Sequence, residues 1–272
     1  MAYEKELEAA LEAARQASAG ILRLYASFQA IADAPADIST EADRQSQAVI
    51  LAHLHQRFPG DAFCAEETSL DNAPNAGPRL WVIDPIDGSR GFARKNGEFS
   101  VMVGFVDGGR VAAGVVLEPA LGRLTYAVRG RGCWRRDGSA GEAVRCYASS
   151  IADLSKATLI QSRSHKDGPP SPELQSLKPA KVVGAYSAGL KLARVARGEV
   201  DIYLNTYPAF HDWDACAGHI LVDEAGGRVT GLAGQELMYH GGAARQTVGL
   251  LATSGRLHEP ALAALRGIRR RI

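Results

Sequence analysis

The sequence lacks an apolar run long enough to span a bilayer, and it lacks an excess of either charge. Its uninterrupted apolar stretches fall well short of the roughly 20 residues that a transmembrane helix needs. With 31 basic and 30 acidic residues, the chain offers no electrostatic footprint for a nucleic-acid polymer or a membrane surface. The basic cluster at residues 266–271 is interpreted as a solvated tail. We therefore expect neither a membrane nor a nucleic-acid polymer as partner.

Cysteine is also scarce, and the N-terminus has none of the features of a secretion signal. The four cysteines are dispersed, with no C-x-x-C pair among Cys64, Cys133, Cys146 and Cys216. This spacing excludes a disulfide scaffold. The first residues are acidic and alanine-rich, whereas a signal peptide is basic and then apolar. We expect a cytoplasmic protein with reduced thiols and no catalytic cysteine.

Hydrophobic periodicity predicts a first half of helices and hairpins and a second half in which strands and helices alternate. Helical spacing of apolar residues is the signal for the helices, and short apolar or alternating runs bounded by turns are the signal for the strands. The expected helices are residues 3–28, a stretch after Thr40, 187–197 and 213–225. The expected strands are residues 80–83, 99–106, 110–117, 124–128, 157–161, 201–204 and 247–252.

This order of elements predicts an α/β (α+β) fold in which helices and sheets form layers. Residues 1–145 are expected to form an α+β half that contains an antiparallel sheet and most of the acidic candidates described below. Residues 146–272 are expected to form an α/β half that contributes Asp214 and the elements that bind the substrate.

The most informative segment is residues 81–89, where a buried strand ends in two carboxylates. Asp84 and Asp87 are three residues apart, on a turn that Pro85 and Gly88 restrict. Mg²⁺ prefers oxygen ligands at about 2.0–2.1 Å, and two Asp side chains on a rigid turn can supply them. Taken alone, the segment is more typical of a β-turn whose Asp side chains bond their own backbone.

Further acidic positions change that interpretation. Glu66 and Glu67 follow another short apolar stretch, and Asp214 opens a predicted helix. Separately, Glu66 is explained as a surface carboxylate, and Asp214 as an acid facing the positive end of a helix dipole. Together with Asp84 and Asp87, they fit one site that holds more than one metal ion.

Five motifs carry a resemblance to a known family. They are Thr40-Glu-Ala-Asp43, Glu66-Glu67, Asp84-Pro-Ile-Asp87-Gly88-Ser89, Trp213-Asp214-x-x-x-Gly218 and Glu224-Ala-Gly-Gly227. Their order and spacing resemble the inositol monophosphatase superfamily from roughly residue 5 to residue 265. The resemblance implies the layered αβαβα sandwich of the inositol monophosphatase and fructose-1,6-bisphosphatase type. It also implies a homodimer and a lithium-sensitive, Mg²⁺-dependent phosphatase.

The resemblance further implies two or three Mg²⁺ ions per subunit. The implied ligands are Glu66, Asp84, the backbone carbonyl of Ile86, Asp87 and Asp214. Such ions can neutralise a phosphate dianion, activate a water and stabilise the leaving oxygen. The family carries a lysine in the loop before Thr40, and residues 30–39 contain none, which leaves the number of ions open.

In the family, a threonine after the Asp-Gly turn orients the attacking water together with an acid. Ser89 occupies this position, and it keeps the hydroxyl without the branch that stiffens a threonine side chain. The resemblance makes Ser89, Glu66 and Asp43 the candidate catalytic residues, with the two acids polarising Ser89 and the water.

Within the superfamily, residues 88–99 resemble the 3'(2'),5'-bisphosphate nucleotidases, whose pattern is D-G-T-K-E-F followed by R-N-G-E-F. Residues 162–165 and the Leu190-Lys191 pair resemble that group as well. The implied substrate is a small phosphate ester, adenosine 3',5'-bisphosphate, which would lose its 3'-phosphate. The expected substrate contacts are Gly88, Ser89, Ser164, His165, Lys191 and Asp214.

Two alternatives stay open. The same metal core suits an inositol-1-monophosphatase or another phosphatase of sugar or polyol phosphates, with histidinol phosphate as a further option. The second alternative is a regulatory binding protein that keeps the fold without much turnover. The missing lysine of residues 30–39 supports it, and the intact set of carboxylates argues against it.

Overall fold

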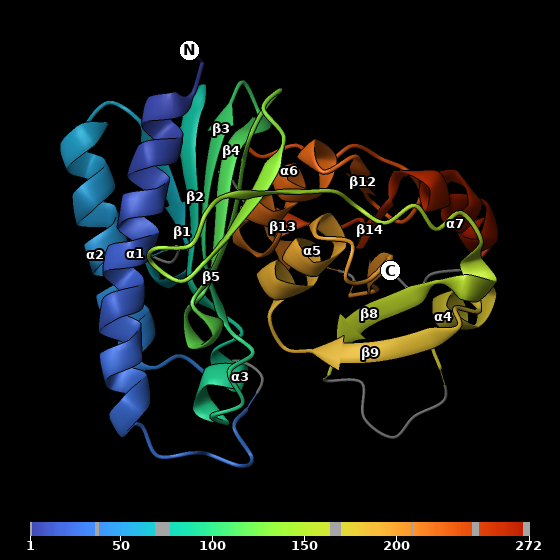
Figure 1. Ribbon diagram of the computed structural model, residues 1–272, viewed down its shortest axis with the longest axis horizontal. Helices are drawn as coiled ribbons and strands as arrows, with labels where there is room; N and C mark the ends of the chain where they lie inside the picture. The colour runs from blue at the N-terminus through green and yellow to red at the C-terminus, as the bar shows by residue number, and fades with distance from the viewer. Residues whose placement is uncertain are drawn as a thin grey trace.

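Five alternating layers of helices and sheets make up the computed structural model (Figure 1). It describes residues 2–35, 38–68, 77–163, 170–207, 209–240 and 245–268. The layers are, in order, α1 (Glu4–Ser27) with α2 (Glu41–Arg57), a seven-stranded sheet, α5 (Ala188–Ala196) with α6 (Cys216–Glu224), a five-stranded sheet, and α4 (Pro172–Leu177) with α7 (His258–Leu265). This arrangement confirms the layered sandwich expected from the sequence.

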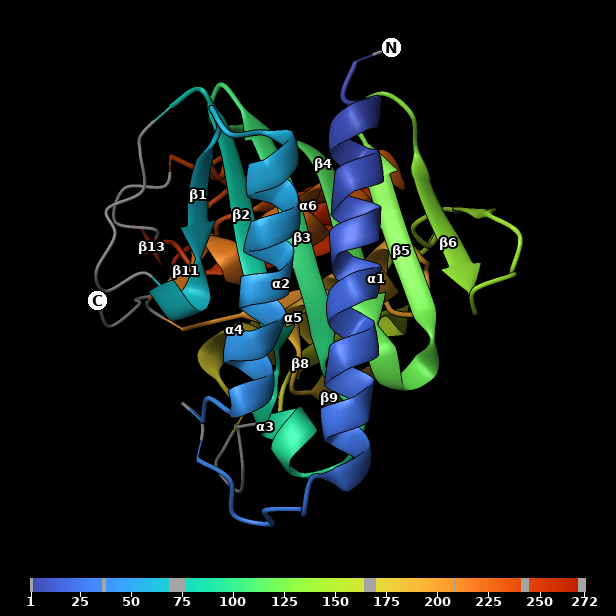
Figure 2. The ribbon, with the colours of Figure 1, turned by 90° about the vertical axis from the view of Figure 1, so that its left-hand side faces the viewer.

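Helices α1 and α2 lie side by side on the outer face of the seven-stranded sheet (Figure 2). The buried face of α1 is built mainly of alanines, namely Ala9, Ala10, Ala13, Ala14 and Ala17. Small side chains at helical spacing let the helix approach the sheet closely. Helix α2 begins with a capping box, in which the Asp43 carboxylate accepts the backbone N–H of Thr40 at 2.8 Å. The cap therefore fixes Asp43 at the first turn of α2.

The seven-stranded sheet follows the order of the sequence. Its strands are β1 (Ala62–Ala65), β2 (Arg79–Asp87), β3 (Ser100–Asp107), β4 (Arg110–Glu118), β5 (Arg123–Val128), β6 (Cys133–Asp137) and β7 (Val144–Cys146). Neighbouring strands are antiparallel, except that β1 and β2 are parallel. The predicted hairpin is β3 with β4. Short turns join most of these strands, as antiparallel pairing allows.

The five-stranded sheet is mixed. Its strands are β8 (Thr158–Ser162), β9 (Lys181–Ala185), β10 (Ile202–Asn205), β12 (Gly227–Thr230) and β14 (Leu250–Ser254), arranged in the order β12-β14-β10-β8-β9. Strand β8 is parallel to both β9 and β10, whereas β14 is antiparallel to β10 and β12. Helices α4 and α5 supply the crossovers that parallel strands require. The division of the chain into halves at residue 145 stays a prediction.

Short elements complete the described chain. They are α3 (Ser89–Ala93), the two-stranded ribbon of β11 (Phe210–His211) and β13 (Arg245–Gln246), and the 3₁₀ turns η1 (Glu66–Thr68), η2 (Pro119–Leu121), η3 (Leu154–Lys156), η4 (Asp212–Asp214) and η5 (Gly255–Leu257). Helix α3 and the turns η1 and η4 all carry predicted site residues. These residues therefore lie next to the ends of regular elements, where the backbone direction changes.

Two glycines let α6 pack directly against the seven-stranded sheet. Gly104 in β3 and Gly114 in β4 are opposite one another in register. A Cβ atom at Gly104 would lie 2.7 Å from Cys216 Sγ, and one at Gly114 would lie 2.4 Å from the Ala217 carbonyl oxygen. Any larger residue would push α6 away from the sheet. The glycines therefore hold the beginning of α6, and Asp214 before it, close to the sheet.

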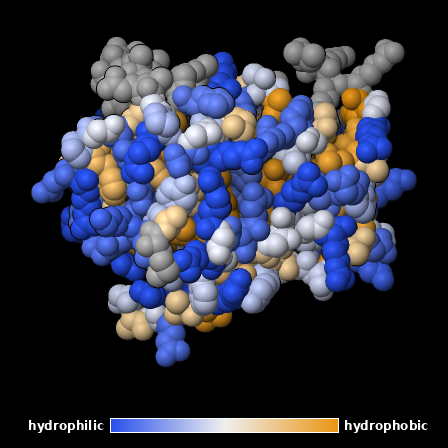
Figure 3. Space-filling view, turned by 90° about the horizontal axis from the view of Figure 1, so that it is seen from above, coloured by the Kyte–Doolittle hydropathy of each residue, from blue (hydrophilic) through white to orange (hydrophobic). Residues whose placement is uncertain are grey.

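Apolar side chains are gathered between the layers. Three buried clusters lie between α1, α2 and the first sheet, around α5 and α6, and between the second sheet and α7. The face shown in Figure 3 is mostly hydrophilic, with hydrophobic side chains in small separate groups. Among the described residues, no helix combines the length and the apolar character needed to cross a membrane.

Candidate active site

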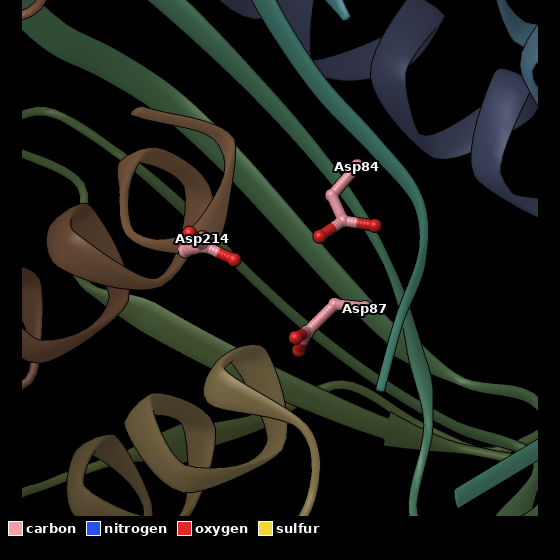
Figure 4. Close-up of side chains that lie close together, drawn as sticks. All are labelled: Asp84, Asp87 and Asp214. Atoms are coloured by element: carbon pink, nitrogen blue, oxygen red, sulfur yellow. The ribbon is translucent and has the colours of Figure 1, made fainter. Parts of the chain in front are cut away.

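An irregularity in β2 directs two carboxylates to the same side of the sheet. In a regular strand, residues three apart point to opposite faces. Asp84 pairs with Met102 of β3, but Asp87 pairs with Ser100, so β2 contains one extra residue between these pairs. Such a bulge changes the direction of the side chains that follow it. Pro85 suits the bulge because it has no backbone N–H that would need a hydrogen bond to the neighbouring strand. Figure 4 shows the Asp84 and Asp87 carboxylates pointing from β2 to a common space.

Asp214 faces the same space from the opposite layer. It ends η4, just before α6, and its Oδ2 accepts the backbone N–H of His211 at 2.7 Å. One carboxylate oxygen from each of Asp84, Asp87 and Asp214 lies within 4.8 Å of the other two (Figure 4). The structure thus brings three of the predicted ligands together, and their role as ligands stays a prediction.

Asp87 is the most tightly held of the three carboxylates. It accepts the backbone N–H groups of Ala188 at 3.0 Å and Gly189 at 2.7 Å, both in the first turn of α5. It also accepts the hydroxyl groups of Ser100 at 3.2 Å and of Ser187. These four donors, two of them at the beginning of α5, fix the orientation of the Asp87 carboxylate.

Asp84 is in the opposite situation, because it is buried beside other acids. Burial raises its pKa well above the ordinary value, and the charges of Glu66, Asp87 and Asp214 raise it further. Its Oδ1 atom is buried and has no hydrogen-bond partner among the described residues. A carboxylate oxygen in this position needs a proton or a cation.

Glu66 and Asp214 show the same electrostatic effect. Burial raises the pKa of Glu66 to about 8, and the charges of Asp214 and Asp43 add to the effect. Burial likewise raises the pKa of Asp214 to about 7, with a contribution from Asp87. A hard divalent cation with oxygen ligands would remove this repulsion, so the residues present fit Mg²⁺.

The predicted catalytic hydroxyl is joined to α2. Ser89 Oγ lies 2.7 Å from Asp43 Oδ1 and 2.9 Å from the carbonyl oxygen of Ile86, so its single proton has two acceptors within reach. Asp43 is also bound through Oδ2 by the Thr40 hydroxyl at 2.6 Å. Burial raises the pKa of Asp43, and the Thr40 and Ser89 hydroxyls oppose this effect. The carboxylate that caps α2 is thus the one that holds Ser89.

The predicted substrate contacts differ in their accessibility. Lys191 Nζ is buried and donates to Ser162 Oγ and to the carbonyl oxygens of Ala185 and Tyr186, each at 3.2 Å. Since an ammonium group has three donors, all of them are occupied in this arrangement. Burial lowers the pKa of Lys191 to about 8. Two other predicted contacts, Ser164 and His165, lie outside the described residues.

Gly88 is placed where no larger residue fits. Its φ is 87°, and a Cβ atom would lie 2.7 Å from the Glu98 carbonyl oxygen and 3.1 Å from Ser187 Cα. The turn that carries Asp87 and Ser89 is therefore in contact with residues 98 and 187.

Sequence reasoning missed Ser100 and Ser187 as the hydroxyl partners of Asp87. The available signal was Ser187 itself, a typical N-cap residue that was instead predicted as the first residue of the helix over 187–197.

The chain is similar to known phosphatases over most of its length. A model described as the inositol monophosphatase family matches residues 2–270. A histidinol-phosphatase of Mycobacterium tuberculosis is 35% identical over 232 residues, which is 83% of this chain and 84% of the relative. The 3'(2'),5'-bisphosphate nucleotidase CysQ of Salmonella typhimurium is 29% identical over 240 residues, 86% of this chain and 93% of the relative.

The solved structures give the same result for the fold. The inositol monophosphatase of Anabaena (Nostoc) sp. PCC 7120 superimposes with a TM-score of 0.80 at 29% identity, covering 99% of this chain and 98% of that chain. The structural similarity and the match to the family model both extend over essentially the full length of the chain. The chain belongs to the inositol monophosphatase family and is a Mg²⁺-dependent phosphoric monoester hydrolase.

Proposed function

We propose that this phosphatase removes the 3'-phosphate of adenosine 3',5'-bisphosphate. The observation that carries the proposal is the place of residues 88–99, the segment that resembles the bisphosphate nucleotidases. Gly88 and Gly91 both pack against the Glu98 carbonyl oxygen, where added Cβ atoms would lie at 2.7 and 2.3 Å. The segment therefore folds back on the turn that carries Asp87 and Ser89, which supports a role for it in contacting the substrate.

The reaction assigns a separate task to each part of the site. The residues that would hold Mg²⁺ are Asp84, Asp87, Asp214, Glu66 and the Ile86 carbonyl, and the ion would neutralise the phosphate dianion and lower the pKa of an attacking water. The Ser89 hydroxyl orients that water, and the carboxylate of an acidic residue accepts its proton. Glu66 and Asp43 are the candidates for this carboxylate. Attack on phosphorus breaks the bond to the 3'-oxygen, which takes up a proton, and releases inorganic phosphate and adenosine 5'-phosphate.

A second candidate function is supported by the comparisons. The histidinol-phosphatase of M. tuberculosis is more similar to this chain, at 35% identity, than the nucleotidase CysQ at 29%. Histidinol phosphate, inositol 1-phosphate and sugar phosphates are therefore the alternative substrates. A regulatory binding protein is the further alternative from another class. The homodimer, the cytoplasmic location and lithium sensitivity rest on the family resemblance and stay predictions.

A phosphate-release panel tests the proposal. Adenosine 3',5'-bisphosphate, inositol 1-phosphate, fructose 1,6-bisphosphate and histidinol phosphate are compared with and without Mg²⁺ and Li⁺. The highest kcat/KM should belong to the adenosine bisphosphate, and a higher value for another ester would select the alternative. Asp87→Asn should lower Mg²⁺-dependent turnover by orders of magnitude, because it removes ligand charge from the metal. Asp223→Asn, at a half-exposed position in α6, is the matched control.

A further inference from the structure

Three arginines surround one tyrosine beside the candidate metal cluster. The guanidinium carbons of Arg90, Arg94 and Arg163 lie 5.6, 6.0 and 6.0 Å from the centre of the Tyr186 ring. An open cavity of 540 Å³ is lined by Arg94, Asn96, Arg163 and Tyr186. Such a density of cationic groups is typical of sites that bind phosphate or carboxylate.

The cluster carries more positive than negative charge. Its acidic member is Glu98, which accepts from Arg163 Nε at 2.8 Å and through a second contact from Arg163 Nη2. Among the described residues, no carboxylate pairs with Arg90 or Arg94. Arg90 Nε is moreover a buried donor without a hydrogen-bond partner there. Two of the three cationic groups are thus available to an anion.

Two members of this cluster, Arg90 and the cavity-lining Tyr186, are chain neighbours of residues in the candidate site. Arg90 follows Ser89, and Tyr186 precedes Ser187, whose hydroxyl binds Asp87. Consecutive Cα atoms are about 3.8 Å apart, so both residues begin next to the catalytic turn. The Tyr186 backbone N–H also donates to Glu98 at 3.2 Å. The arginines around Tyr186 are therefore next to the turn at which the reacting phosphate would be held.

We infer that Arg94, Arg90 and Arg163 around Tyr186 form a subsite for a second anionic group on the leaving-group side of the substrate. This inference rests on the proposed phosphatase function and names the feature that selects bisphosphates over monophosphates. The subsite takes the role for which the sequence favoured Lys191, whose three donors are occupied within the protein. For an adenosine bisphosphate, the bound group is the 5'-phosphate.

Matched substrate pairs test the subsite in the full chain. Adenosine 3',5'-bisphosphate is compared with adenosine 3'-phosphate, and fructose 1,6-bisphosphate with fructose 1-phosphate. Arg94→Met should lower kcat/KM for the bisphosphates by about 10- to 100-fold, which is the effect of losing a charged hydrogen bond. The same substitution should change kcat/KM for the monophosphates by less than about twofold. Arg94→Lys should recover part of the loss. Arg256→Met, at an exposed position in η5, should leave both values unchanged.

A binding measurement separates failure of the subsite from failure of the proposed function. Calorimetry with adenosine 5'-phosphate and adenosine needs no turnover. The parent protein should bind adenosine 5'-phosphate more tightly than adenosine. Arg94→Met should weaken the binding of adenosine 5'-phosphate by about tenfold or more. Absence of hydrolysis of adenosine 3',5'-bisphosphate would reject the proposed substrate. Equal bisphosphate preference and equal binding in Arg94→Met and the parent would overturn the subsite, whichever ester is hydrolysed.

Discussion

Asp43 Oδ1 lies 2.7 Å from the hydroxyl oxygen of Ser89, a residue 46 positions further along the chain. The same carboxylate binds the backbone N–H and the hydroxyl of Thr40 through Oδ2. One oxygen therefore caps α2 and the other orients the predicted catalytic hydroxyl. A side chain shared between a helix cap and a catalytic turn transmits the position of α2 to the site.

Ser89→Ala should lower kcat by about tenfold or more, yet by less than the loss of a metal ligand, since water orientation is one contribution among several. Ser89→Thr should retain most of the activity, because it keeps the hydroxyl that Asp43 and the Ile86 carbonyl hold. Steady-state phosphate release at saturating Mg²⁺ measures both variants. An alanine variant as active as the parent would remove Ser89 from the mechanism.

The packing of Asp84 predicts a variant that gains stability and loses function. Its carboxylate is buried among three acids and has an oxygen without a hydrogen-bond partner among the described residues. Asp84→Asn should therefore raise the melting temperature of the metal-free protein, by about 2–4 °C for each kcal/mol of relieved repulsion. It should also abolish the Mg²⁺-dependent rise in melting temperature that a bound ion gives the parent.

Thermal unfolding with EDTA and at several Mg²⁺ concentrations measures both effects for Asp84→Asn. Asp223→Asn serves as the control, because its half-exposed carboxylate lies outside the cluster. A lower melting temperature for metal-free Asp84→Asn than for the metal-free parent would show that repulsion between the acids does not control stability at this position.

Elements with a strong local signal could be predicted from the sequence. The hairpin of β3 and β4 was expected at residues 99–106 and 110–117 and occupies Ser100–Asp107 and Arg110–Glu118. Helix α2 begins after Thr40 because the cap and its acidic first turn are local features. By contrast, β9 was missed, since a short strand with exposed Lys181 and Val182 has no pattern that distinguishes it from a loop.

The site depended on features that are not local. Strand β2 was expected to stop before Asp84, but it continues through a bulge to Asp87 and so turns both carboxylates to one side. The helix expected from residue 213 is a 3₁₀ turn followed by α6 from Cys216. The hydrogen bond of Ser187 to Asp87 joins residues 100 positions apart, and no spacing in the sequence predicts it.

Gly114→Ala should destabilise the protein, because the added methyl group would meet the backbone oxygen of Ala217 at 2.4 Å. Overpacking of this kind costs about 1–3 kcal/mol. The displaced α6 should also move Asp214 and lower the apparent affinity for Mg²⁺. Urea unfolding and Mg²⁺ titration of activity measure the two effects. Gly60→Ala has open space around the new methyl group and should behave like the parent.

A buried histidine in the C-terminal half predicts how stability depends on pH. His258 Nε2 lies 3.0 Å from Thr230 Oγ1, and Nδ1 lies 2.9 Å from Thr253 Oγ1. The Thr230 hydroxyl donates to the Gly231 carbonyl at 2.8 Å, so it accepts the proton of Nε2 and leaves Nδ1 to accept from Thr253. This network holds the ring neutral, and burial followed by the charge of Arg228 lowers its pKa from 6.5 to about 4.

Because the folded state has the lower pKa, the unfolded chain binds more protons below pH 6.5, and stability is lost as the pH falls from about 6.5 to about 4. His258 should account for at most about 2 kcal/mol of the loss between pH 7.5 and pH 5. His258→Gln is neutral throughout this range, so its unfolding free energy should fall less between these two pH values than that of the parent. Urea denaturation at both pH values measures the difference. Equal losses in the variant and the parent would show that other groups, among them the clustered acids Asp84 and Asp214, cause the whole pH dependence.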